Sequence, residues 1–156
     1  MAATTLAGTT GNDILNAPGS QSALVQGLAG VDTITLSLAA DEAQGGAGND
    51  SISLTRGNTV SNTIYGGAGN DTVYIRSAAV FGGYVDLGAG TDSIRLATAA
   101  ATTSLVGANV FGGEGNDTLA FANAVTTSTV GAGSGNDILS FTAAQAISSS
   151  LVYGGR

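Results

Sequence analysis

The sequence predicts an all-β protein, a right-handed parallel β-solenoid of about seven turns with roughly 20 residues in each turn. Two observations predict this fold: a glycine-rich turn recurs along the whole chain, and apolar and polar residues alternate after each turn. The 156 residues contain 25 Gly but only 5% aromatic residues, which favours a narrow core of stacked aliphatic rows over a wide core. The length predicts a single domain, residues 1–156.

The glycine-rich turn has the pattern Gly-Gly-x-Gly-x-Asp. Its closest copies are residues 45–50, 66–71 and 112–117. With the looser copies included, the aspartates that end the turns are Asp13, Asp32, Asp50, Asp71, Asp92, Asp117 and Asp137. The intervals between them are 19, 18, 21, 21, 25 and 20 residues, so the repeat occurs from one end of the chain to the other.

Each aspartate is followed by a short strand with one buried face. Large apolar residues stand two and four places after the aspartates, with the exception of Ala17, and the places between them are mostly polar. A second strand precedes each turn, and its buried position lies seven places before the aspartate. The three buried rows are Leu15, Ile34, Ile52, Val73, Ile94, Leu119 and Leu139; Ala17, Leu36, Leu54, Ile75, Leu96, Phe121 and Phe141; and Leu6, Val25, Ala43, Ile64, Val85, Val110 and Val130.

A connection of variable length joins the two strands of successive repeats, and it includes residues 17–20, 56–59 and 97–103. Insertions fit there without interrupting the stack of turns. Because one turn cannot bury its own apolar face, each turn depends on its neighbours for stability.

The net charge of −7 excludes several partners. With 4 Arg and no Lys, the chain cannot neutralise a row of phosphates, so we expect no nucleic acid partner. No apolar run approaches the roughly 20 residues of a membrane helix, and residues 1–6 lack the features of a Sec signal peptide. The absence of His, Cys and Lys argues against an enzyme.

The repeat aspartates predict a metal site. Stacked strands lie about 4.8 Å apart, so a column of carboxylates repels itself unless a cation lies between them. Gly permits a positive φ, which turns backbone carbonyls into the gaps between turns. Such all-oxygen ligands suit Ca²⁺, whereas Zn²⁺ and Cu²⁺ favour the His and Cys that the chain lacks. The alternative is a set of β-turns without metal, because Asn and Asp are ordinary turn residues.

With these residues, the repeat resembles the hemolysin-type calcium-binding repeat (RTX), with the consensus Gly-Gly-x-Gly-x-Asp-x-U-x, where U is large and apolar. The resemblance is closest at Asp50, Asp71 and Asp117 and weakest at Asp32 and Asp92. It implies that each Ca²⁺ is held by the aspartate and the second and fourth carbonyls of one turn, and by the first and third carbonyls and the aspartate of the next. Besides the seven aspartates, the implied metal-binding residues are Gly45, Gly46, Ala47, Gly48, Gly66, Gly67, Ala68, Gly69, Gly88, Ala89, Gly90, Gly112, Gly113, Glu114 and Gly115.

Family β-rolls usually carry two such nonapeptides per turn, but here the opposite corner has no consensus. We therefore expect one row of several ions, up to about six, in the six gaps between seven turns. Away from this row, Asp41, Glu42 and Asp86 are expected to be solvated. The aromatic residues Tyr65, Phe111 and Tyr153 are expected to be packing or surface residues in preference to a sugar-binding row.

The resemblance also implies type I secretion without a cleaved N-terminal signal, and folding outside the cell when Ca²⁺ binds. We expect a structural protein at the cell surface or in the extracellular matrix, of the filament, matrix or S-layer type. Residues 152–156 match the start of an eighth turn, and neither end resembles a cap, so the expected partner is a second copy joined head to tail. The alternatives are a monomeric calcium-stabilised module of a larger type I-secreted protein, and an ice- or ligand-binding solenoid.

Overall fold

The structure is a computed structural model that describes residues 4–38, 40–55, 59–76, 80–96, 104–141 and 147–155. All regular elements in these ranges are strands, and every strand pair is parallel, so the predicted all-β parallel solenoid is confirmed. Within the same ranges there is no helix with the length and hydropathy needed to cross a membrane. Two of the predicted connections lie mostly or wholly outside the described residues, at 56–58 and 97–103.

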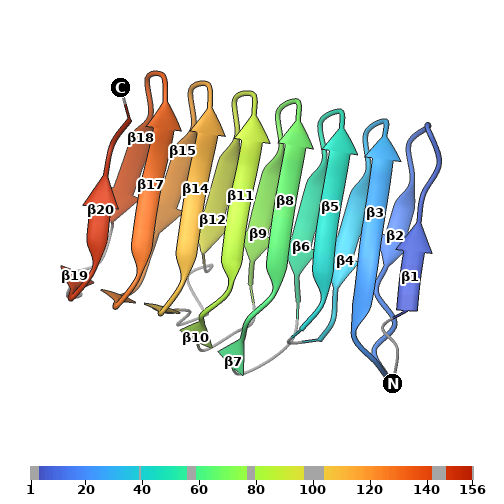
Figure 1. Ribbon diagram of the computed structural model, residues 1–156, viewed down its shortest axis with the longest axis horizontal. Coiled ribbons are helices and arrows are strands. Elements are labelled where there is room, and N and C mark those ends of the chain that lie inside the picture. The colour runs from blue at the N-terminus through green and yellow to red at the C-terminus, as the bar shows by residue number, and fades with distance from the viewer. Residues whose placement is uncertain are drawn as a thin grey trace.

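The strands form three sheets that run along the molecule (Figure 1). The front sheet contains β1 (Thr4–Ala7), β3 (Ala23–Ala29), β5 (Glu42–Ala47), β8 (Thr63–Ala68), β11 (Tyr84–Ala89), β14 (Asn109–Glu114), β17 (Thr129–Ser134) and β20 (Leu151–Tyr153). The back sheet contains β2 (Ile14–Asn16), β4 (Thr33–Leu36), β6 (Ser51–Leu54), β9 (Thr72–Ile75), β12 (Ser93–Leu96), β15 (Thr118–Phe121) and β18 (Ile138–Phe141). The short sheet contains β7 (Thr59–Val60), β10 (Val80–Phe81), β13 (Ser104–Val106), β16 (Val125–Thr126) and β19 (Ile147–Ser148).

The chain winds as a right-handed coil, the hand that was predicted. In Figure 1 each front strand runs upward, the chain crosses over the top to the back sheet, and the next coil lies to the left. The turns that end at Asp13 and Asp137 are six circuits apart, close to the predicted number of about seven turns. All the glycine-rich turns therefore lie along one edge of the coil.

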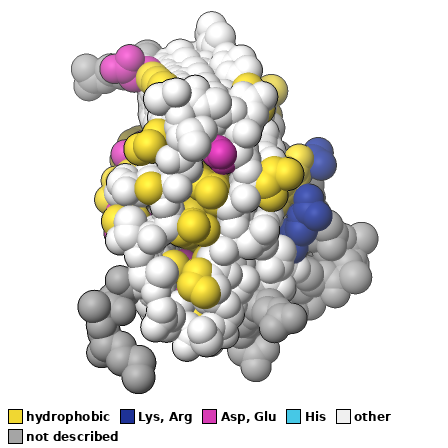
Figure 2. Space-filling model, turned by 90° about the vertical axis from the view of Figure 1, so that its right-hand side faces the viewer, with side chains coloured by type: hydrophobic (Ala, Val, Ile, Leu, Met, Phe, Trp, Pro, Cys, Tyr) yellow, Lys and Arg dark blue, Asp and Glu magenta, His cyan; other side chains and the backbone are white. Residues whose placement is uncertain are grey.

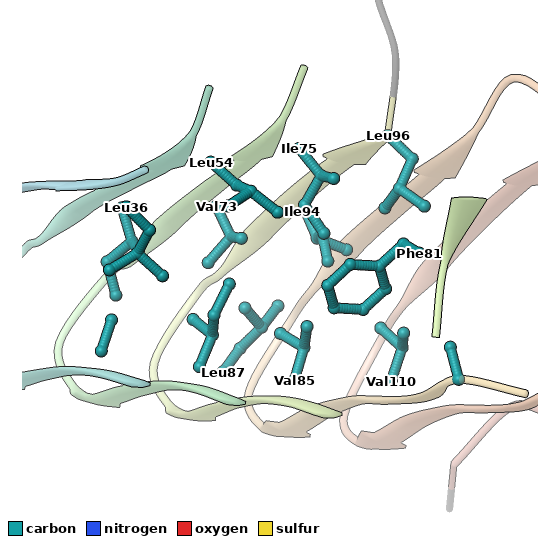
Figure 3. Close-up of a cluster of buried hydrophobic side chains, with 14 of the residues drawn as sticks. Leu36, Leu54, Val73, Ile75, Phe81, Val85, Leu87, Ile94, Leu96 and Val110 are labelled. Carbon is teal, nitrogen blue, oxygen red and sulfur yellow. The ribbon is translucent and has the colours of Figure 1, made fainter. Parts of the chain in front are cut away.

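The core lies between the three sheets and contains the three predicted rows. Residues in register stack like on like, for example Ile34 on Ile52 and Ile52 on Val73. Figure 3 shows the centre of the core, where Ile75 and Leu96 from the back sheet face Val85 and Val110 from the front sheet. Among the described residues of these rows, the partly buried ones are the end positions Leu6, Leu139 and Phe141, because a terminal coil has one neighbour instead of two.

The short sheet is a feature that the sequence analysis did not predict. The stretches treated there as variable connections contain two- or three-residue strands that pair in parallel. Phe81, Leu105 and Val125 point inward from these strands and expose 1% of their surface or less. Strands this short show no alternation in the sequence, and insertions of unequal length hide their period. The isolated large apolar residues were the available signal.

Asp41 is buried, and the expectation that it is solvated is wrong. Its side chain is 1% exposed, and its Oδ1 accepts the backbone N–H of Ala23 at 2.9 Å. Its Oδ2 accepts the N–H groups of Ser37 and Leu38 at 3.1 and 2.8 Å. Backbone donors at a coil corner need partners, and this carboxylate supplies them. Asp41 therefore fastens the corner opposite the glycine-rich turns.

Candidate metal centre

The glycine-rich turns stack directly on one another at the upper edge of the coil in Figure 1. Each turn begins where a front strand ends, and equivalent positions pair in register, as Gly46 does with Gly67 and Ala47 with Ala68. The predicted site residues 45–48, 66–69, 88–90 and 112–115 therefore occupy equivalent places in four of the seven turns. Each of the seven turns ends at one of the seven predicted aspartates.

Positive φ angles at alternate positions give the turns their shape. In the fourth position these are Gly30, Gly48, Gly69, Gly90, Gly115 and Gly135, and in the second position they are Leu28, Gly46, Gly67, Gly88, Gly113 and Gly133. A Cβ atom on Gly67 or Gly69 would overlap the carbonyl oxygen of Gly46 or Gly48 in the preceding turn. The second and fourth carbonyls therefore project toward the next turn, and the glycines of that turn leave them room.

The first and third carbonyls project in the opposite direction. The carbonyl oxygen of Ala68 accepts the N–H of Gly48 in the preceding turn at 2.7 Å. The carbonyl oxygen of Gly66 lies beside Gly45, where a Cβ atom would overlap it. The gap between these two turns is therefore lined by four carbonyls, those of Gly46 and Gly48 from one turn and of Gly66 and Ala68 from the next.

The repeat aspartates form a hydrogen-bonded ladder along the coil. In each step, the backbone N–H of one aspartate donates to Oδ1 of the aspartate in the next turn, at 2.6–2.9 Å. The ladder runs through Asp13, Asp32, Asp50, Asp71, Asp92, Asp117 and Asp137. This use of Oδ1 was not foreseen in the sequence, where the aspartates were considered only as metal ligands. One oxygen of each carboxylate from Asp32 onward is thus already occupied by the backbone.

The second carboxylate oxygen of these aspartates has no partner. The buried Oδ2 atoms of Asp32, Asp50, Asp71, Asp92, Asp117 and Asp137 accept no hydrogen bond among the described residues. A Cβ atom on Gly45 would lie 2.5 Å from Asp50 Oδ2, and one on Gly66 would lie 2.6 Å from Asp71 Oδ2. The first glycine of the turn therefore leaves a hollow in which an unpaired carboxylate oxygen meets the carbonyl of the next turn. A buried charge without a partner is costly, so this hollow favours a cation.

Burial raises the pKa of four of these carboxyl groups. The pKa of Asp71 rises to about 7 and that of Asp92 to about 6, first because burial disfavours the charged form. The same cause raises the pKa of Asp50 and Asp117. The ladder hydrogen bonds act in the opposite direction, while the neighbouring aspartates raise the pKa further.

The donor set fits Ca²⁺. No three carboxylate, His or Cys side chains gather at one point within the described ranges, so carboxylates alone do not form the site. Each gap instead offers backbone carbonyls together with unpaired carboxylate oxygens. A hard cation that accepts 6–8 oxygen ligands in a flexible geometry matches this set, whereas Mg²⁺ requires a near-ideal octahedron.

The two turns with the weakest consensus retain the same ladder but differ in their side chains. Asp32 and Asp92 both donate to and accept from their neighbours, like the other repeat aspartates. In the turn of Asp32, Leu28 takes the second position with a φ of 80°, where the other turns from Asp50 onward have glycine. In the turn of Asp92, the buried side chain of Leu87 takes the position of the first glycine. Both turns keep the same backbone arrangement, but each has a leucine side chain where the consensus has a glycine.

A second ladder, formed by asparagines, was missed in the sequence. The residue before the aspartate is Asn12, Asn49, Asn70, Asn116 or Asn136 in five of the turns. The Oδ1 of Asn49 accepts the N–H of Asn70 at 2.7 Å, and the Oδ1 of Asn70 accepts the N–H of Thr91 at 2.8 Å. Asn12 and Asn116 act in the same way on Val31 and Asn136. The recurrence of Asn at this place was the signal that could have identified it.

Comparison with known proteins agrees with this geometry. The family model of the RTX calcium-binding nonapeptide repeat matches four segments, residues 3–17, 26–60, 61–74 and 109–120. The turns that end at Asp92 and Asp137 lie outside these segments, although the aspartate ladder includes both. No curated protein and no solved structure gives a significant match. These four segments carry RTX calcium-binding nonapeptide repeats, which bind Ca²⁺, and they match the hemolysin-type family that the sequence resembles.

Proposed function

We propose that this chain is a secreted structural protein that folds when Ca²⁺ binds its row of turns and then associates with copies of itself. The observation that carries the proposal is the row of buried Oδ2 atoms without partners, which at Asp32, Asp50, Asp71 and Asp117 lie beside a carbonyl of the next turn. Such a row is self-repulsive when empty of cations and cohesive when filled. Calcium binding and folding are then one process.

The proposed ligands of one ion are the carbonyls of Gly46 and Gly48, the carboxylate of Asp50, and the matching groups of the next turn. Those matching groups are the carbonyls of Gly66 and Ala68 and the carboxylate of Asp71. In the following gap, Gly67, Gly69 and Asp71 act with Leu87, Ala89 and Asp92. The bound ion supplies positive charge between the carboxylates, while the aspartate ladder holds each Oδ1 in place.

The proposed location is outside the cell, after type I secretion. RTX repeats are typical of extracellular proteins that leave the cell by this route. With little free Ca²⁺ in the cytosol, the repulsion between the aspartates disfavours the coil, and abundant Ca²⁺ outside favours it. No catalytic role is proposed, since the sequence has no His, Cys or Lys and the repeat fold is structural.

Self-association is supported by the two ends of the described coil. Each of β1 and β20 is hydrogen-bonded to one neighbouring strand of the front sheet. Figure 2 shows the end that carries β1 and β2, where hydrophobic side chains form a band on this face. At the other end, residues 154–155 and 135–139 line a pocket beside the unpaired Oδ2 of Asp137. Head-to-tail stacking would cover both ends and supply further ligands to this pocket.

Light scattering tests the proposal. The molar mass is measured in EDTA and again after addition of millimolar Ca²⁺ or Mg²⁺, with circular dichroism recorded on the same samples. We expect β-structure and a large increase in mass with Ca²⁺ but not with Mg²⁺. Folding with Ca²⁺ at a constant mass near 15.0 kDa would contradict self-association and indicate a monomeric module of a larger secreted protein. Folding that is indifferent to Ca²⁺ would overturn the proposal as a whole.

A second candidate function is ice binding, and one observation favours it. The outward residues after the aspartates place hydroxyl groups in register along the back sheet, at Thr33, Ser51, Thr72, Ser93 and Thr118. The neighbouring column is irregular, because it contains Tyr74 and Arg95. A thermal hysteresis assay on the calcium-loaded protein tests this function, and an absence of hysteresis would exclude it.

A further inference from the structure

The outward face of the front sheet carries a cluster of three aromatic rings around one carboxylate. Tyr65 on β8, Asp86 on β11 and Phe111 on β14 are paired side by side across three adjacent strands. Tyr84 precedes Asp86 by two residues on β11 and therefore points to the same face. The ring centroid of Tyr84 lies 5.7 Å from that of Tyr65 and 5.8 Å from that of Phe111. The carboxylate of Asp86 is thus bordered by an aromatic residue on three sides.

The charge of Asp86 is poorly balanced by its surroundings. Its hydrogen bond from the Tyr84 hydroxyl is long, at 3.4 Å. The sequence has no Lys or His; Arg76 stacks on Tyr74 of β9 in the back sheet, and Arg95 belongs to β12 of the same sheet. The other two arginines, Arg56 and Arg156, lie outside the described residues. Because the faces of aromatic rings are themselves negative, a carboxylate among them creates a local attraction for a cation.

We propose that Tyr65, Tyr84, Asp86 and Phe111 bind a quaternary ammonium group. Rings beside a single carboxylate supply attraction to a diffuse positive charge but few hydrogen-bond acceptors. A guanidinium or primary ammonium group would find few protein acceptors here in exchange for the hydration that it loses, and Ca²⁺ would lack its 6–8 oxygens. A methylated ammonium has no donors to satisfy and presents an apolar surface to the rings.

The strands on either side of the cluster carry no further free carboxylate among the residues in register with Phe111 and Tyr65. Beyond Phe111, the column continues with Gly131, and the ring of Tyr153 packs over that glycine, where a Cβ atom would lie 2.6 Å from the ring. Before Tyr65, the column continues with Gln44, whose Nε2 donates to Glu42 Oε1 at 2.7 Å. Glu42 is therefore a carboxylate of the same sheet face whose charge is already engaged, which makes it a matched control for Asp86.

The test is a titration of the calcium-saturated protein with tetramethylammonium chloride, followed by the NMR shifts of the Tyr ring protons. Sodium chloride at equal ionic strength and tert-butanol, a neutral molecule of similar shape, serve as controls. We expect saturable binding of tetramethylammonium alone. In Asp86→Asn and Tyr84→Leu the affinity should fall by about tenfold or more, while Glu42→Gln and Tyr74→Leu should change it by less than about twofold. An unchanged calcium-folding midpoint verifies that each variant retains the fold.

Two outcomes would overturn the proposal. One is a tetramethylammonium affinity that Asp86→Asn leaves unchanged, or an equal response to tert-butanol, because the carboxylate would then have no role. The other is saturable binding of a neutral probe, cellohexaose, that the ring variants abolish and Asp86→Asn does not, without binding of tetramethylammonium. That result would assign the cluster to carbohydrate recognition. None of the four residues belongs to a glycine-rich turn, so failure here leaves the calcium-dependent folding untouched.

Discussion

The backbone N–H of Asp50 donates a 2.8 Å hydrogen bond to Oδ1 of Asp71, one turn further along the coil. The other oxygen of Asp71 is buried and has no partner. One side chain therefore has two separable tasks: its Oδ1 fastens neighbouring turns with or without metal, and its Oδ2 offers charge to a cation. Substitutions that remove one task but keep the other distinguish them.

Asp71→Asn should weaken calcium binding more than it weakens the coil. The amide oxygen replaces Oδ1 as the acceptor for Asp50, while the negative charge is lost. We expect the Ca²⁺ midpoint of folding, followed by circular dichroism, to rise by about tenfold or more. Asp71→Ala removes the ladder bond as well and should cost a further ~1–3 kcal/mol of stability at saturating Ca²⁺. Equal midpoints for Asp71→Asn and the unmodified chain would show that Asp71 is no ligand.

The calcium-free protein should be more stable in mild acid than at neutral pH. Burial raises the pKa of Asp71 from 3.8 to about 7 and that of Asp92 to about 6, so the folded state binds these protons more tightly than the unfolded chain. Folding stability is then greatest below about pH 4 for these groups and decreases as the pH rises through 6 and 7. In EDTA, circular dichroism should therefore show more residual β-structure at pH 5 than at pH 7.5, where the chain is expected to be largely unfolded.

With saturating Ca²⁺ the effect of pH on stability should reverse. Protons and Ca²⁺ compete for the same carboxylates, so binding is stronger at pH 7.5, and the thermal midpoint should be higher there than at pH 5. A β-structure content in EDTA that increases with pH would contradict the assignment of raised pKa values to these buried aspartates.

Leu28→Gly should stabilise the protein. Leu28 has a φ of 80° in the position where five other turns have glycine, and its side chain is 47% exposed, so little burial is lost. Relief of the left-handed strain is expected to contribute roughly 1 kcal/mol, measured by thermal unfolding at fixed Ca²⁺. The control is Leu24→Gly on the same strand, where φ is not positive and glycine should destabilise by roughly 0.5–1 kcal/mol.

Gly67→Ala should destabilise the protein. Gly67 occupies the second position of its turn, as Leu28 does in the turn of Asp32. The added Cβ atom would overlap the carbonyl of Gly46, which is also a proposed ligand. We expect a loss of at least ~2 kcal/mol of stability and a higher Ca²⁺ midpoint, both measured by circular dichroism. A neutral result would mean that neighbouring turns do not approach each other as closely as the structure has them.

The front and back sheets could be predicted from the sequence because their period is carried by large side chains. Alternation after each aspartate placed Ile52 and Leu54 in the core, and both are fully buried. The short sheet escaped prediction because strands such as β10 contribute only one inward residue, here Phe81. Its burial depends on unequal connections, which no local pattern reveals.

The site was predicted less completely than the fold. The turns and their aspartates follow from the repeat, since a positive φ and close backbone contact require glycine at fixed places. The two ladders depend on which atom of Asp71 or Asn49 meets the adjacent backbone, and composition does not show this. Asp41 was misjudged for the same reason, because its partners Ala23 and Leu38 come from a different coil corner than the repeat.

Asp41→Asn and Asp41→Ala should both destabilise the protein without changing its calcium sites. Asp41 accepts three backbone N–H groups and is 1% exposed, so alanine leaves three buried donors without a partner. We expect a loss of about 2–4 kcal/mol for alanine and a smaller loss for asparagine, which has one oxygen acceptor instead of two. The surface variant Asp86→Ala is the control and should change stability by less than about 0.5 kcal/mol.

Since Asp41 lies at the corner opposite the glycine-rich turns, the number of Ca²⁺ ions bound by the folded protein, measured by equilibrium dialysis, should be the same in all three variants. A lower number in Asp41→Ala would mean that this corner also controls the spacing of the turns that bind metal.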